Sequence, residues 1–453
     1  MKITWIDPEE LIEREFSQAR EEGRRVSCWP AEWEKAKQNI NEPLELRALA
    51  ETFWNRLAST PPGPYERSEP SDLKGIFSLC SAPRSPLEVN LKPSVLEDKI
   101  KGGWLGRAAG CLLGKPVEGK PRYWIRELLM ASNRWPLDDY FSAAGIPPEV
   151  FSEHTWHKSY QVALRENIIC MPEDDDLNYT MLNLHTAEQF GPNFTSKDVL
   201  QMWLTALPVL QTFTAERVAY LNALQFFAPP ETARWMNPYR EWIGAQIRAD
   251  LWGWITPGNP RYAAELAYRD AAISHTKNGI YGAMFVAALI SACFAVDNVS
   301  DAILIALDYV PAESRLNEAL RYTIDLCSTK RSFESAVDEI YAKFGHYHWV
   351  HTINNGALLV AALLYGDNDF EKTICYSVMG GWDTDSNGAT AGSILGGLLG
   401  AKNIPHKWTG PLNNRIRTSL KGFDNSSFDN LAAKTLRLID RFASTTERSE
   451  SYD

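Results

Sequence analysis

The sequence is poor in the cysteine patterns that build disulfide frameworks and zinc sites. Its 453 residues contain 7 cysteines, which are scattered along the chain without any Cys-x-x-Cys pair. An odd number of scattered cysteines predicts reduced thiols, and the absence of paired spacing excludes zinc fingers. We therefore expect a cytoplasmic protein with free thiols.

Basic residues are also too few for a protein that binds nucleic acid. The formal net charge is −11, whereas binding to a long phosphate backbone requires clustered Lys and Arg. The first sixteen residues are acidic and lack the basic and then apolar layout of a secretory signal. The expected partner is therefore not a nucleic acid, and the oligomeric state is left open.

Long hydrophobic runs are nearly absent. Residues 279–296 form one uncharged stretch, which just reaches the length of a membrane span but is rich in Gly, Ala and Ser. No second span supports a membrane location, so this run predicts a buried core helix. No membrane partner is expected.

The periodicity of apolar residues predicts an all-α protein. Apolar residues recur at helical spacing from about residue 96 onward, with almost no period-two alternation. Prolines suited to a first helical turn predict helices over 8–22, 30–40 and 43–58. The expected organisation is a helical accessory segment (1–60), a Pro-rich linker or wrapping arm (61–95), a catalytic domain (96–445) and a C-terminal tail (446–453).

Two segments carry a glycine at every fourth residue. The first has Gly102, Gly106, Gly110 and Gly114, and the second has Gly388, Gly392, Gly396 and Gly400. On a helix this spacing makes a stripe without side chains, and each glycine costs about 1 kcal/mol relative to alanine. Close approach to a neighbouring backbone would compensate, so both helices are predicted to lie deep in the core.

The first acidic cluster is Glu173-Asp174-Asp175-Asp176, directly before a helical run. Adjacent carboxylates repel one another, and keeping them ionised in a partly buried place requires a compensating cation. The alternative is that these acids only cap the helix and complement its dipole.

The second cluster, Asp383-Thr384-Asp385-Ser386, lies between a Gly-Gly turn and the second glycine stripe. Two Asp residues two apart can aim oxygens at one ion, and oxygen ligands suit Mg²⁺, Mn²⁺ or Ca²⁺ better than zinc. The alternative here is an Asx-turn that caps the next helix.

Several motifs, taken in order, resemble those of the ADP-ribosylglycohydrolase family, of the dinitrogenase reductase activating type. The resemblance rests on Lys99 to Gly106, Gly110 to Glu118, Glu173 to Asp176, Ser274 to Gly282 and Gly380 to Gly388. Two positions depart from the family pattern. Asp174 stands where Thr is usual, and Cys111 stands where Asp is usual.

The resemblance implies an orthogonal helical bundle with two Mg²⁺ (or Mn²⁺) ions in a central cleft, and it assigns residues to three roles. The implied metal ligands are Asp174, Asp175, Asp176, Asp383, Asp385 and Ser386. Glu118 and Asp175 are the expected catalytic carboxylates. The expected substrate contacts are His275, Asn278, Gly279 and Tyr281, to which Trp382 is added as an aromatic ring that could stack on a base.

The implied activity is hydrolysis of an N- or O-glycosidic bond to ADP-ribose or a related ribosyl compound, so the expected partner is a small-molecule or ADP-ribosylated substrate. Two cations would hold the ribose and a water, and Glu118 would act as general base or would orient that water. The alternatives are a nucleoside or small N-glycoside hydrolase on the same fold and a catalytically silent, crystallin-like binding protein. An isoprenoid-cyclising enzyme is disfavoured because Asp383 and Asp385 lie in a glycine turn.

Overall fold

The computed structural model describes residues 3–40, 42–83, 85–153, 155–330 and 332–449. These residues form α-helices and short 3₁₀ turns, and their only β-pairings are four isolated bridges. The all-α prediction is therefore confirmed. None of the described helices is long and apolar enough to cross a membrane.

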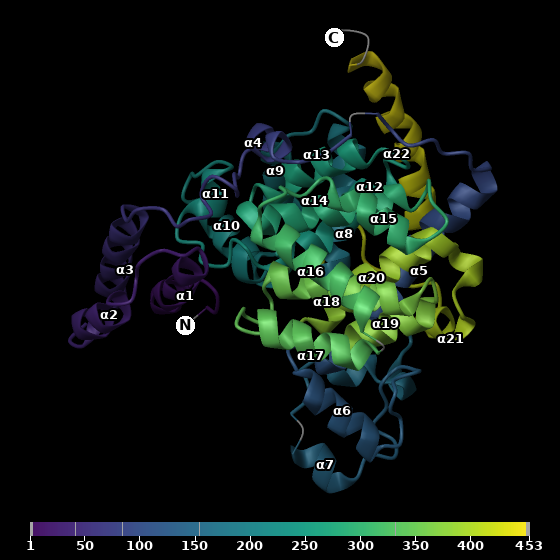
Figure 1. Cartoon of the computed structure of the whole chain (residues 1–453), viewed down its shortest axis with the longest axis horizontal. Helices are drawn as coiled ribbons and strands as arrows, with labels where there is room; N and C mark the ends of the chain where they lie inside the picture. The colour runs from purple at the N-terminus through teal and green to yellow at the C-terminus, as the bar shows by residue number, and fades with distance from the viewer. Residues whose placement is uncertain (1–2, 41, 84, 154, 331, 450–453) are drawn as a thin grey trace.

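The N-terminal segment forms three helices at one side of the molecule (Figure 1), namely α1 (Pro8–Glu21), α2 (Trp29–Lys37) and α3 (Pro43–Ala58). Their apolar faces enclose Trp33 and Phe53 and continue onto Val218 and Trp242 of the main body. The Pro-rich arm that follows contains one short helix, α4 (Leu73–Ser78). This helix was not predicted, because the many prolines around it favour an irregular segment.

At the centre of the fold lie α5 (Pro93–Gly114) and α20 (Thr384–Leu399), which carry the two glycine stripes. The stripes face each other residue by residue. A Cβ added to Gly106 would lie 2.0 Å from the carbonyl oxygen of Gly392, and a Cβ on Gly392 would lie 2.0 Å from the carbonyl oxygen of Gly106. Only glycine permits this backbone contact, which confirms the predicted deep packing of both helices.

The remaining helices lie around this pair and beyond it (Figure 1). In chain order they are α6 (Arg122–Ala131), α7 (Pro148–Glu153), α8 (Asp175–Phe190), α9 (Ser196–Ala206), α10 (Thr214–Leu224), α11 (Glu231–Arg234), α12 (Asp250–Trp254), α13 (Pro260–Ala271), α14 (Lys277–Ala292), α15 (Val299–Leu307), α16 (Arg315–Thr329), α17 (Phe333–Phe344), α18 (Thr352–Gly366), α19 (Phe370–Met379), α21 (His406–Thr409) and α22 (Phe428–Ser449).

Two of these helices bear on the sequence expectations. The uncharged run forms α14, which is buried from Asn278 to Ala292 as predicted. The last helix, α22, continues to Ser449 and so includes the first part of the expected tail. Residues 450–453 of that tail lie outside the described part of the chain.

Candidate active site

Three helix ends meet at the predicted acidic site. The C-terminus of α5 leads through a 3₁₀ turn, Lys115–Val117, to Glu118, while α8 and α20 begin beside it. Two backbone hydrogen bonds join the residues that follow Glu118 to the residue that precedes Asp383. Gly119 N–H donates to the Trp382 carbonyl at 2.9 Å, and Trp382 N–H donates to the Lys120 carbonyl at 3.0 Å. Glu118 is therefore fixed next to Asp383.

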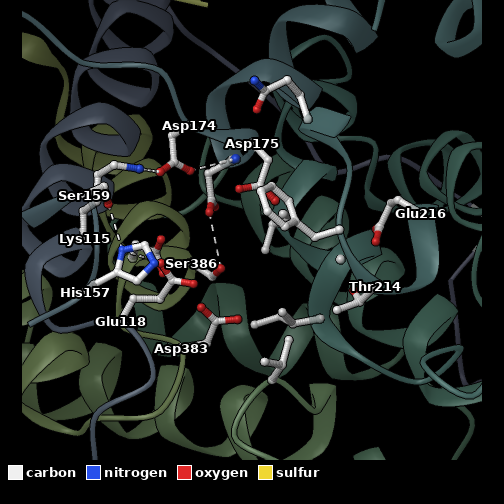
Figure 2. Close-up of a pocket in the computed structure, with 18 of the residues that line it drawn as sticks. Lys115, Glu118, His157, Ser159, Asp174, Asp175, Thr214, Glu216, Asp383 and Ser386 are labelled. Atoms are coloured by element: carbon white, nitrogen blue, oxygen red, sulfur yellow. Dashed lines mark hydrogen bonds and ion pairs between the residues drawn. The ribbon is translucent and has the colours of Figure 1, made fainter. Parts of the chain in front are cut away.

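The three ends line one cleft with a volume of about 260 Å³. Every predicted metal ligand lies in its wall, and Figure 2 shows Asp174 and Asp175 on one side with Asp383 and Ser386 below them. Apolar side chains also line the cleft, namely those of Trp5, Phe213, Ile243, Trp349 and Val350.

Two carboxylates of the first acidic cluster form ion pairs with cationic side chains. Asp174 forms a close ion pair with Lys115 and also caps α8 by accepting a hydrogen bond from Asp176 N–H at 3.0 Å. Asp176 pairs with the fully buried Arg107 at 3.0 Å, and Arg107 also pairs with Asp250 at 2.9 Å. The capping alternative thus holds for Asp174, although its side chain also faces the cleft.

The second cluster has a different environment. Oxygens of Glu118, Asp383 and Asp385 lie within 4.8 Å of one another. Asp383 occupies the N-cap position of α20, but its side chain accepts no capping hydrogen bond. Among the described residues, their closest basic partner is His157, 3.3 Å from Glu118. Helix capping therefore does not account for Asp383.

Asp174 differs electrostatically from the other carboxylates of the site. Burial and the neighbouring carboxylates hold the pKa values of Asp175, Asp383 and Asp385 above their usual range, and burial also raises the pKa of Asp176 although Arg107 opposes it. Burial opposes ionisation of Asp174 as well, but the Lys115 ammonium lowers its pKa. Burial and nearby lysines lower the pKa of His157 to about 4, so this imidazole is neutral at pH 7.

The carboxylates of the second cluster fit a hard divalent cation. They are oxygen donors, Asp383 and Asp385 are each 5% exposed, and no Lys or Arg of the described chain pairs with them. Mg²⁺ and Mn²⁺ favour such ligands.

Comparison with known proteins gives the family. The sequence profile described as ADP-ribosylglycohydrolase matches residues 92–447. The chain belongs to the ADP-ribosylglycohydrolase family. No curated protein matches the chain. A solved structure described as an ADP-ribosylglycohydrolase-related protein complex is similar at 18% identity and a TM-score of 0.48, covering 77% of this chain and 99% of that one.

The ADP-ribosylglycohydrolase profile begins after the N-terminal segment, yet that segment reaches the cleft. Trp5 lies in the cleft wall. Its backbone N–H donates to the Glu10 carboxylate at 3.1 Å, and its ring packs edge-on against Tyr239 with 5.8 Å between the ring centroids. Nothing in the spacing of the first residues indicated this contact. His157, Glu216 and Lys115 were also not singled out from the sequence, although Lys115 stands inside the first motif.

The expected substrate contacts lie apart from this cleft. None of His275, Asn278, Gly279 and Tyr281 belongs to the cleft wall formed by the described residues. Their polar groups serve the packing of the fold: His275 contacts Ser274 at 2.8 Å, Asn278 donates to Glu241 at 2.7 Å, and the Tyr281 hydroxyl donates to the Pro70 carbonyl. This stretch therefore does not line the cleft of the predicted metal ligands, although His275 Nε2 lies 3.9 Å from Oε1 of Glu216, which does.

Trp382 lies next to the site without lining it. It has a positive φ of 63° and is 6% exposed, and its ring stacks on Tyr341 at 4.1 Å. Tyr341 in turn donates to the Gly380 carbonyl at 2.7 Å. In this position Trp382 supports the turn that presents Asp383.

Proposed function

We propose that this protein hydrolyses an N- or O-glycosidic bond to ADP-ribose or a related ribosyl compound, with a divalent cation at the acidic side of the cleft. The observation that carries the proposal is the meeting of the three family motifs at one cleft. There, Asp175 and the group Glu118, Asp383 and Asp385 line the same cleft as several apolar side chains. The dinitrogenase reductase activating type is the subfamily that we propose, on the motifs that resemble it.

The acidic and the apolar side chains of the lining suit different parts of such a substrate. A bound cation would polarise the ribose hydroxyls and lower the pKa of a nearby water. The carboxylates would balance positive charge that develops on the sugar during bond cleavage. The aromatic and aliphatic side chains of the lining, among them Trp5, Phe213 and Trp349, would contact a base or another apolar leaving group.

Asp175 is the carboxylate that we assign to proton transfer. It lines the cleft at the N-terminus of α8, and no Lys or Arg of the described chain pairs with it. Glu118, which the sequence also suggested for this role, lies among the second-cluster carboxylates and is suited to hold the cation.

A second candidate is hydrolysis of a nucleoside or small N-glycoside. It is favoured by Trp5, because a side chain from outside the family domain narrows the apolar end of the cleft. Substrates that lack the diphosphate and the second ribose would need less of that space.

A product assay distinguishes these candidates. Purified protein is incubated with ADP-ribosylated peptides, O-acetyl-ADP-ribose and simple nucleosides, with Mg²⁺ or with EDTA, and the free ribosyl product is quantified. We expect release from one substrate class, loss of release in EDTA and in Asp175→Asn, and normal release in Glu188→Gln. Binding of ADP-ribose without release from any substrate would instead support the silent, crystallin-like alternative.

A further inference from the structure

The charges of the cleft are divided unequally between its two acidic groups. Asp174 pairs with Lys115, and Asp176 pairs with Arg107, which Asp250 shares; Asp175 beside them has no Lys or Arg partner among the described residues. Glu118, Asp383 and Asp385, whose oxygens lie within 4.8 Å of one another, form no ion pair with Lys or Arg of the described chain. The Lys115 ammonium therefore already occupies the position beside Asp174, whereas the three carboxylates of the other group have no such partner.

We infer that Lys115 takes the place of one of the two metal ions that the family resemblance implies, so that this chain binds a single divalent cation at Glu118, Asp383 and Asp385. This inference deepens the proposed function and rests on it for the cation's catalytic purpose. The departures of this chain from the family pattern explain how Lys115 can replace a metal ion. Asp174 replaces a neutral Thr, and its added negative charge is met by the Lys115 ammonium.

The position of Lys115 supports this assignment. It is the residue directly after α5, at the C-cap, and is 7% exposed. Its ammonium contacts the Asp174 oxygen that is not used to cap α8, since Asp174 Oδ1 accepts from Asp176 N–H and Oδ2 pairs with Lys115. A metal ion bound by Asp174 would have to displace this ammonium.

The neighbouring ligand positions point the same way. Cys111, whose side chain is fully buried, stands where the family pattern has Asp. Hard cations prefer oxygen ligands to sulfur. Asp176 is held by Arg107 on one oxygen and accepts from the Ser386 hydroxyl at 3.3 Å on the other.

Metal stoichiometry tests the inference without any substrate. The full-length protein, stripped with EDTA, is titrated with Mn²⁺ by calorimetry and analysed for bound manganese after dialysis. We expect one ion per chain for the wild type and for Lys120→Ala, a control lysine outside the cleft wall. Lys115→Ala should bind two ions, because Asp174 becomes available as a ligand.

Electron paramagnetic resonance gives an independent readout. Two Mn²⁺ ions about 3.5–4 Å apart, as in two-metal sites, should show exchange coupling, whereas one isolated ion gives a six-line spectrum. We expect the six-line spectrum from wild type and a coupled spectrum from Lys115→Ala. If Lys115→Ala does not fold, the double variant Lys115→Ala/Asp174→Thr, which removes both members of the ion pair, replaces it.

Two ions bound to the wild type, or one ion bound to the folded Lys115 variants, would overturn the inference. Failure of the glycosidase proposal would be seen separately, as absence of product release by a protein that still binds one Mn²⁺.

Discussion

The contact between the glycine stripes of α5 and α20 can be tested with two alanine substitutions in one helix. At Gly392, a Cβ would lie 2.0 Å from the carbonyl oxygen of Gly106. Carbon and carbonyl oxygen approach to about 3.3 Å at closest, so the two backbones must separate by about 1 Å. At Gly397, by contrast, a Cβ meets no atom within 4 Å.

These distances set the expected size of the effect. Overpacking of a core contact costs about 1–3 kcal/mol of the free energy of unfolding. An unobstructed glycine-to-alanine change inside a helix contributes up to about 1 kcal/mol of stability. The helix-propensity gain is common to both variants, so Gly392→Ala should be less stable than Gly397→Ala by about 1–3 kcal/mol.

Urea unfolding followed by circular dichroism and tryptophan fluorescence would measure this difference as a shift in midpoint. We also expect Gly392→Ala to weaken Mn²⁺ binding, because α5 leads to Glu118 and α20 begins directly after Asp383. The Thr384 hydroxyl, which donates to the Gly114 carbonyl at 2.8 Å, joins the two helices at that end. Equal midpoints for the two variants would refute the backbone contact.

Three further predictions concern the cleft. Mg²⁺ or Mn²⁺ should raise the melting temperature relative to EDTA-treated protein, since a ligand that binds only the folded state stabilises it by about 2.7 kcal/mol at a hundredfold excess over its Kd; coincident melting curves would contradict a cation site. Asp383→Asn and Asp385→Asn should lose turnover and cation-dependent stabilisation while folding normally, because each removes a ligand charge and keeps the side-chain volume. Glu188→Gln, whose parent side chain pairs with Lys434 at 3.0 Å outside the cleft wall, is the control, and equal activity in all three variants would rule out a role for the Asp pair. Trp5→Ala should raise KM and leave kcat nearly unchanged, because Trp5 lines the cleft with an apolar ring that cannot transfer a proton or bind a cation as a carboxylate does; an unchanged KM would remove it from the substrate site.

The helices and their central packing could be predicted from local patterns. The glycines at every fourth residue indicated a backbone contact. The prolines predicted the first residues of α1, α2 and α3 to within one residue. These features depend on residues near one another in the sequence. The short helix α4 was missed because the prolines around it dominate the local composition.

The surroundings of individual polar residues could not be predicted in the same way, because they depend on partners far away in the sequence. The Ser274-His275 stretch is typical of a ligand contact, but Arg248 donates to the Ser274 hydroxyl at 2.8 Å and the Asn278 side chain accepts from Leu316 N–H at 3.0 Å. Spacing alone cannot distinguish a polar group that binds substrate from one that holds two helices together. The role of these residues in substrate binding stays a prediction.

The helix ends around the cleft explain why the acidic cluster can form and why it still needs a cation. The N-termini of α8 and α20 each carry a partial charge of about +0.5, which favours nearby carboxylates, and the C-terminus of α5 favours the adjacent Lys115 ammonium. The N-terminus of α20 lies at Asp383 and offsets about half a negative charge there, whereas the N-terminus of α8 lies at Asp174 and Asp175. The three carboxylates of Glu118, Asp383 and Asp385 exceed this amount by more than two charges when ionised. A single divalent cation supplies most of that difference, whereas Asp174 and Asp176 already pair with Lys115 and Arg107.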